Sequence, residues 1–267
     1  MMRTVPDLAD AELEIENGVA IMRFNRDDVR NELTGTRLAA EIVFVCEWIN
    51  ASREIGTLIL TGAGSAFCAG GNIHDMHQRK GMFGGNPMEI QQGYRQGIQR
   101  MARAMAEIEV PTIAAINGAA IGAGLDLACM CDIRIGSQRA KLGETFVNLG
   151  IIPGDGGAWF LPRVVGMQRA AEMTFSGRIV GADEACQMGL LLEVVEPDGL
   201  MARCQDMAAG FASKPRDALR IAKRLLSSGQ RMQLPDFLDY CAGMQSICHS
   251  SDEHDAALET MINAMAK

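Results

Sequence analysis

The stretch INGAAIGAGLDLACMCD, residues 116–132, combines three glycines and four alanines with only two charged residues, Asp126 and Asp132. Such small, apolar side chains predict a buried turn that enters a helix. A carboxylate is costly to bury unless something compensates its charge. Two explanations of Asp126 compete: the turn could cradle the phosphates of a dinucleotide, or its backbone N–H groups could serve another negative charge.

The whole chain has the composition of an ordinary globular protein. Of its 267 residues 48% are hydrophobic and 22% charged, which predicts one domain, alone or with an appendage. Its 25 basic and 33 acidic residues give a net charge of −8, which disfavours a nucleic acid or an anionic membrane as partner. Eight cysteines without a repeating spacing, no signal peptide and no long apolar run predict a reduced, cytoplasmic setting.

Strand and helix patterns alternate along the first part of the chain. Residues 12–25 predict a β-hairpin, because apolar residues alternate on both sides of Asn17-Gly18. A helix is expected over 34–52, with Thr34 as its N-terminal cap. Further strands are expected at 57–62, 111–117, 132–136 and 191–196. The alternation predicts an α/β core.

Two segments differ from this alternation. The polar, glycine-rich segment 76–97 predicts a mobile excursion over a site, or a plain surface loop, that leads into a helix at about 88–109. After residue 197 the sequence predicts helices only, at 200–213, 216–228, 235–249 and 253–266. We therefore expect a core over residues 1–197 and a C-terminal helical region over residues 198–267.

Several kinds of site fail on spacing. A dinucleotide-binding turn needs a third small residue three positions after the second glycine, and after Gly124 that position is Leu127. No Gly-x-Ser-x-Gly elbow exists for an activated serine. His74 and His77 have no further ligands at zinc-site spacing, so they indicate a solvated helix and no metal site.

Two loops share one pattern. AFCAGGNI (66–73) and NGAAIGAGLDLACMCDIRI (117–135) each follow a buried strand and lead through small residues into a helix. The first N–H groups of a helix lack partners inside it, and the helix dipole adds positive potential there. One N–H from each loop, aimed at one point, would form an oxyanion hole.

These loops resemble those of the crotonase superfamily, the enoyl-CoA hydratase and isomerase family. The similarity continues in FNRDDVRNEL (24–33), in KLGETFVNLGIIPGDGGAWFLPRVVG (141–166) and in GADEACQMGLLLEVV (181–195). The resemblance implies an α/β fold, a crotonase-like spiral of ββα units with a C-terminal helical trimerisation region. It also implies acyl-CoA substrates, no cofactor beyond the coenzyme A of the substrate, and a homotrimer or a dimer of trimers.

The resemblance assigns the family's machinery to particular positions. The two oxyanion N–H donors fall on Gly71 and Ala123, which would hold the thioester oxygen while the neighbouring carbon becomes an enolate. The first catalytic carboxylate falls on Asp126, one methylene shorter than the usual glutamate. Asp126 could instead satisfy backbone N–H groups at a helix N-terminus.

The second catalytic glutamate of the hydratases falls on Phe146, which transfers no proton. Glu144 would point to the same side as Phe146 in an extended segment, and Asp155 lies in a turn that the family places against the substrate. Each is a candidate to assist Asp126 or a structural acid. Asp132 precedes a strand, where an ion pair or a turn role is expected.

Further positions follow as substrate contacts. Arg30 is a candidate for the phosphates of coenzyme A, or an ordinary surface arginine. The resemblance implies further substrate-binding residues at Ala69, Gly71, Asn72, Ile73, Gly122 and Phe146.

The sequence therefore predicts an enzyme that hydrates an enoyl-CoA or shifts its double bond through a stabilised enolate. Isomerisation needs one carboxylate to move a proton, so it tolerates Phe146 better than hydration does. The alternatives are thioester hydrolysis or decarboxylation within the same family, and an acyl-CoA-binding protein with little turnover.

Overall fold

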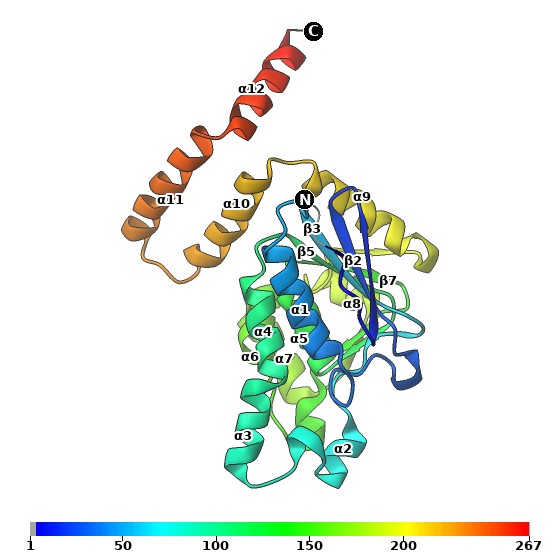
Figure 1. The fold of residues 1–267 in the computed structure, drawn as a ribbon. Coiled ribbons are helices and arrows are strands. Elements are labelled where there is room, and N and C mark those ends of the chain that lie inside the picture. Colours follow the sequence, from blue (N-terminus) through cyan, green and yellow to red (C-terminus); the bar gives the residue numbers. More distant parts are fainter. Residues whose placement is uncertain (1–3, 267) are drawn as a thin grey trace.

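The computed structural model describes residues 4–266, and it contains two β-sheets surrounded by helices (Figure 1). The larger sheet has the strand order β1-β2-β3-β5-β7-β10 and the smaller one β4-β6-β8-β9. The six strands of the larger sheet are β1 (Ala11–Glu16), β2 (Val19–Phe24), β3 (Thr57–Gly62), β5 (Thr112–Ile116), β7 (Ile133–Ser137) and β10 (Glu193–Val195). The four strands of the smaller sheet are β4 (Ala66–Cys68), β6 (Ala119–Ile121), β8 (Lys141–Gly143) and β9 (Ile179–Gly181).

Twelve α-helices lie within the described residues. They are α1 (Leu38–Asn50), α2 (Ile73–Gln78), α3 (Pro87–Gln96), α4 (Ile98–Glu107), α5 (Ala123–Met130), α6 (Gly157–Val165), α7 (Met167–Ser176), α8 (Ala182–Gln187), α9 (Leu200–Ala212), α10 (Arg216–Gly229), α11 (Leu234–His249) and α12 (Asp252–Met265). Four short 3-10 turns are η1 (Asp27–Val29), η2 (Gly81–Phe83), η3 (Thr145–Leu149) and η4 (Pro197–Gly199).

The chain repeats one unit three times. A strand of the larger sheet, a strand of the smaller sheet and a helix follow one another as β3-β4-α2, β5-β6-α5 and β7-β8-α6. Neighbouring strands from successive units pair in parallel, for example β3 with β5 and β4 with β6. The first two units deliver a helix N-terminus a few residues after a strand of the smaller sheet, whereas η3 lies between β8 and α6 in the third. The predicted α/β class is confirmed.

The predicted hairpin is confirmed. Its strands β1 and β2 pair antiparallel, and the turn residues Asn17 and Gly18 have φ of 50° and 80°. Positive φ at both central residues is the conformation that Asn-Gly adopts most readily in a two-residue turn.

Two sequence expectations about helices were wrong. Helix α1 begins at Leu38, and Thr34 does not cap it, because the Thr34 hydroxyl accepts a hydrogen bond from the Asn72 N–H (2.7 Å). The helix expected at about 88–109 is two helices, α3 and α4, which meet at Gly97 with φ −97° and ψ −114°. The segment 76–97 is largely helical, and α3 starts with a capping box between Asn86 and Glu89.

The larger sheet is buried on both faces. Leu58 and Leu60 of β3 point to the side covered by α1 and α4, whereas Ile59 points to the side covered by α9. Because helices cover both faces of this sheet, all six residues of β3 are buried, and its sequence does not alternate between apolar and polar residues.

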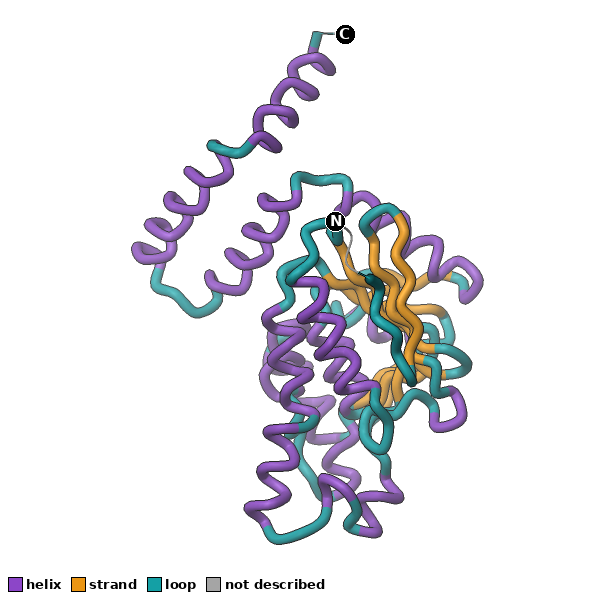
Figure 2. Tube along the Cα trace, in the orientation of Figure 1, coloured by secondary structure: helices purple, strands orange, loops and turns teal. Residues whose placement is uncertain are grey.

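Helices α11 and α12 extend away from the core (Figure 1), whereas α10 is held to it through Arg220 and Lys223; Figure 2 shows that no strand accompanies α11 and α12. Helix α9 lies against the sheet, so the division of the chain near residue 197 stays a prediction. No helix within residues 4–266 is long and apolar enough to cross a membrane.

Candidate active site

Two glycines bring the predicted oxyanion loops together. A Cβ on Gly70, whose φ is +89°, would lie 3.2 Å from the Ala123 nitrogen and collide with the Ile121 carbonyl. A Cβ on Gly124 would likewise collide with the Cys68 carbonyl. Only residues without a side chain permit this approach, so the N-termini of α2 and α5 lie side by side.

The N–H groups of Gly71 and Ala123 have no hydrogen-bond acceptor within residues 4–266. Ala123 is the first residue of α5, where an N–H has no partner inside the helix. Its predecessor Gly122 adopts φ +53° and ψ −121°, a conformation that residues with a side chain rarely adopt. The geometry leaves two backbone donors open beside each other.

Asp126 lies in the first turn of α5, and its side chain is fully buried. Its Oδ2 atom accepts a hydrogen bond, 3.0 Å long, from the N–H of Gly157, and Gly157 is the first residue of α6. The carboxylate thus caps a neighbouring helix rather than its own, whose N-cap position is Gly122. Its Oδ1 atom meets no donor within the described chain.

Glu144 brings a second buried carboxyl to Asp126. It is 1% exposed, and neither of its side-chain oxygens has a donor in the described part of the chain. A Cβ at Gly157 would collide with both carboxyls, so the missing side chain leaves the space that they occupy. Two ionised carboxyls this close would repel each other, which favours the protonated form of one of them.

Burial favours the protonated form of both carboxyls. Desolvation, followed by the charges of Glu144 and Asp155, raises the pKa of Asp126 well above its ordinary value. Desolvation also raises the pKa of Glu144 to about 7, although the neighbouring Asp126 carboxyl opposes the change. Both carboxyls therefore keep a proton to higher pH than ordinary acidic side chains do.

Asp155 adds a third buried acid from the turn before α6. It is 5% exposed, and desolvation raises its pKa to about 6. Its charge acts on both Asp126 and Glu144, and it raises the pKa of Tyr94 after desolvation. The structure thus brings together all three acids that the sequence singled out.

Phe146 closes the other side of the site. It is 7% exposed, and its ring lies 3.7 Å from the position of a Cβ on Gly122. The expectation that Glu144 and Phe146 share one side of an extended segment was wrong, because Glu144 precedes the 3-10 turn η3, which includes Phe146. Glu144 reaches Asp126 because the chain turns there.

The remaining predicted substrate contacts border the oxyanion loop. Asn72 caps α2, its Oδ1 atom accepting from the Asp75 N–H at 2.9 Å, and Ile73 is 54% exposed. The Arg30 carbonyl accepts from the Ala69 N–H, and the Arg30 side chain is exposed. The backbone of Arg30 thus lies at this loop.

Asp132, at the other end of α5, has the structural role expected for it. Its Oδ2 atom accepts from the Thr112 N–H and from Lys223 Nζ, both at 2.7 Å. Sequence reasoning missed Gly157 and Tyr94. The double glycine after Asp155 was the available signal for Gly157, whereas nothing local marks Tyr94.

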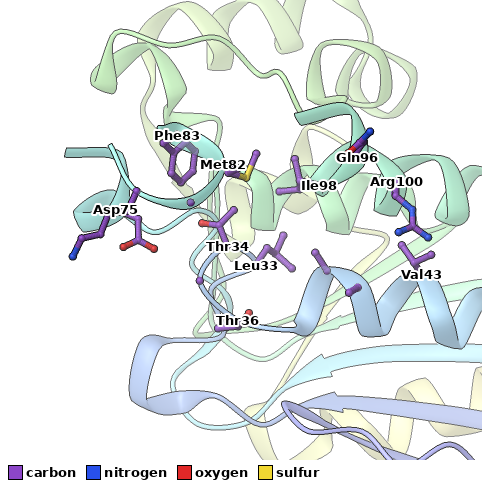
Figure 3. A pocket seen from close by; sticks show the side chains of 16 residues that line it. Leu33, Thr34, Thr36, Val43, Asp75, Met82, Phe83, Gln96, Ile98 and Arg100 are labelled. Atoms are coloured by element: carbon purple, nitrogen blue, oxygen red, sulfur yellow. The ribbon is translucent and has the colours of Figure 1, made fainter. Parts of the chain in front are cut away.

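A cavity of about 290 Å³ lies between α1 and the segment from α2 to α4 (Figure 3). Leu33, Met82 and Phe83 give it apolar walls, and Arg100 lies at one end of the view. Thr34 borders it and also supports the oxyanion loop through Asn72. Within the described residues, no group of three His, Cys, Asp or Glu side chains is placed to hold a metal ion.

Comparisons with known proteins agree with this site. The model of the family "Enoyl-CoA hydratase/isomerase" matches residues 14–263. The chain is 34% identical to the short-chain-enoyl-CoA hydratase of Clostridium acetobutylicum, over 96% of this chain and 95% of that protein. It is 31% identical to the 1,2-epoxyphenylacetyl-CoA isomerase of Escherichia coli, over 90% of each. The crystal structure of enoyl-CoA hydratase from Bacillus anthracis superposes with a TM-score of 0.88 at 30% identity, covering 96% of this chain and 97% of that one.

The chain belongs to the enoyl-CoA hydratase/isomerase family of the crotonase superfamily. The predicted crotonase-like fold and the predicted class of enzyme are therefore confirmed.

Proposed function

We propose that this protein is an enoyl-CoA isomerase, which moves a double bond by shifting a proton between two carbons of the acyl chain. The buried carboxyl pair of Asp126 and Glu144, which we propose shares one proton, carries the proposal. A proton shift needs a base to take a proton from one carbon and an acid to return it to another.

In the first step the ionised carboxylate of the pair takes a proton from the carbon beside the thioester carbonyl. The electrons of that C–H bond move into an enolate, whose oxygen would accept hydrogen bonds from the Gly71 and Ala123 N–H groups. In the second step a carboxyl of the pair returns a proton to the far carbon of the unsaturated system. The pair then has the charge with which it started.

Phe146 favours this reaction over hydration. Water added to a double bond must be held by polar groups, and Phe146 offers none on its side. An unpaired polar group costs about 1–3 kcal/mol to bury. A proton shift between carbons needs no such water.

The direct test uses two substrates with the same acyl length. We expect conversion of a 3-enoyl-CoA into the conjugated 2-enoyl-CoA, followed by the rise of its ultraviolet absorbance. Hydration of crotonyl-CoA should be slow, and Phe146→Glu should accelerate it. Fast hydration without isomerisation by the unchanged protein would refute the proposal.

Hydration remains the second candidate because Asp155 is a third buried acid near the pair. In that case Asp155 and Asp126 would hold the water that the family's two glutamates hold. The same pair of assays separates the candidates. Tight binding of an acyl-CoA with neither product would indicate the binding protein instead.

We further propose that copies of the chain associate into a trimer or a dimer of trimers. Apolar side chains at least 54% exposed lie along α11 and α12, namely Leu234, Leu238, Ile247, Met261, Ile262 and Met265. A single chain leaves them in water, which favours association. Light scattering at micromolar concentration tests this, and a monomer mass would refute it.

Other proposals concern the substrate and the location. Coenzyme A would be part of the substrate, and the exposed Arg30 is proposed to meet its phosphates; Arg30→Ala should raise KM more than it lowers kcat. All eight cysteines are free thiols, which suits a reducing compartment, and we propose the cytoplasm.

A further inference from the structure

A second cavity, of about 300 Å³, lies beside Asp155. Helix α4 supplies one wall through Gln99, Ala102, Arg103 and Ala106, and helix α6 supplies the other through Trp159 and Phe160. Asp155, with Gly154 and Gly156 beside it, borders this cavity. The charge of Asp155 raises the pKa of both carboxyls of the pair, so Asp155 connects the pair with this cavity.

The turn that carries Asp155 is held from both sides. Gln99 Nε2 donates to the Gly154 carbonyl at 2.9 Å, and the Tyr94 ring lies 3.6 Å from the position of a Cβ on Gly154. A Cβ on Gly156 would lie 3.1 Å from the Phe160 ring and 3.7 Å from the Ala102 Cβ. Asp155 therefore keeps a fixed place between the pair and the cavity.

The cavity opens to water beside an aromatic wall. Trp159 is 44% exposed, its ring meets Phe160 at 4.7 Å between centroids, and Arg163 lies 3.7 Å above the Trp159 ring. The titratable groups around Asp155 are Tyr94 from α3, Arg103 from α4, Cys68 from β4, and the pair itself.

We propose that Asp155 relays protons between the carboxyl pair and solvent through this cavity. The inference rests on the proposed isomerase function and deepens it. A proton taken from the substrate breaks a C–H bond and forms an O–H bond on the pair. That proton passes to the Asp155 carboxylate and then to water in the cavity, and a proton from water returns by the same route. The proton delivered to the far carbon then comes from solvent.

The test is a single turnover of a 3-enoyl-CoA in deuterium oxide, with mass spectrometry of the product. We expect the unchanged protein to place deuterium from the solvent on the far carbon in most product molecules. Ala102→Leu fills the cavity without altering any acid, so the deuterated fraction should fall about fivefold while the rate of isomerisation changes by less than about twofold. Ala106→Leu, on the same wall, should act in the same direction.

Ala39→Leu is the matched control, because Ala39 borders the other cavity and the same methyl groups are added there. It should leave the deuterated fraction unchanged. Asp155→Ala should also lower that fraction, and added formate should restore it. Formate should fail to restore it in Asp155→Ala combined with Ala102→Leu, because the route for the small acid is then filled.

Two results would overturn the relay while leaving the isomerase intact. One is a product of the unchanged protein that carries the substrate's own proton, and the other is an unchanged deuterated fraction in both cavity-filling variants. Absence of any double-bond shift would instead refute the proposed function, and the relay with it.

Discussion

One aspartate lies in the first turn of α5 and another lies two residues beyond its C-terminal end, but the protein surrounds them differently. At the C-terminal end, the Oδ2 atom of Asp132 receives hydrogen bonds from Thr112 and an ion pair from Lys223, and its side chain is 40% exposed. At the N-terminal end, Asp126 is fully buried and receives one N–H, from Gly157. A second acid, Glu144, lies where a cation would be expected.

This difference separates structural charge from charge kept for chemistry. An acid that is paired with a cation and with N–H donors can stabilise the fold, whereas a buried acid whose neighbours are other acids lowers the free energy of unfolding. Perturbed pKa values of this kind gather at functional sites. We therefore expect substitutions at the two ends of α5 to affect different measurements.

Asp126→Asn should have the largest effect, because it removes a group that transfers protons. We expect kcat to fall by about two to four orders of magnitude while affinity for acyl-CoA changes little. The amide oxygen can still accept from the Gly157 N–H, so the variant should fold. Its matched control is Asp132→Asn, which should keep kcat. Equal losses of kcat in the two variants would contradict the distinction.

Arg220→Met tests how helix α10 is held against the core. Arg220 is 8% exposed, and its guanidinium donates to Glu109 at 2.8 Å and to the Ser52 carbonyl at 2.7 Å. Removing it leaves the buried Ser52 carbonyl without this donor, whereas Glu109 keeps Arg224, and we expect a loss of about 3 kcal/mol in urea unfolding. Arg224 binds the same Glu109 but is 49% exposed, so Arg224→Met should cost less than about 1 kcal/mol. Similar losses in both would refute this assignment.

Glu144→Gln should raise stability at high pH by about 2–3 kcal/mol. The pKa of Glu144 is about 7 in the folded state, above the ordinary value of 4.5. As the pH rises, the Glu144 carboxyl loses its proton in the unfolded chain at lower pH than in the folded protein. The free energy of unfolding therefore falls between about pH 4.5 and about pH 7 and stays low above that. Urea unfolding at about pH 5 and about pH 8 measures the effect, with the exposed Glu14→Gln as control. A variant less stable than the unchanged protein at the higher pH would contradict it.

Local sequence patterns predicted the hairpin and the two small-residue loops, because small residues and turns leave local signals, whereas the three acids became candidates through the resemblance to the family. The same patterns could not predict the contact between Asp126 and Glu144. That contact depends on the turn at η3 and on the space left by Gly157, which are set by how distant segments pack. The break of the expected helix at Gly97 and the true partner of Thr34 are tertiary features of the same kind.

The shared proton of Asp126 and Glu144 is the central claim, and infrared spectroscopy tests it most directly. A protonated carboxyl has a C=O stretching band that an ionised carboxylate lacks. For the unchanged protein at about pH 7 we predict such a band, which should be absent from the variant that combines Asp126→Asn with Glu144→Gln. The variant that combines Asp132→Asn with Glu14→Gln should retain the band. Absence of any protonated carboxyl from the unchanged protein at that pH would contradict the account.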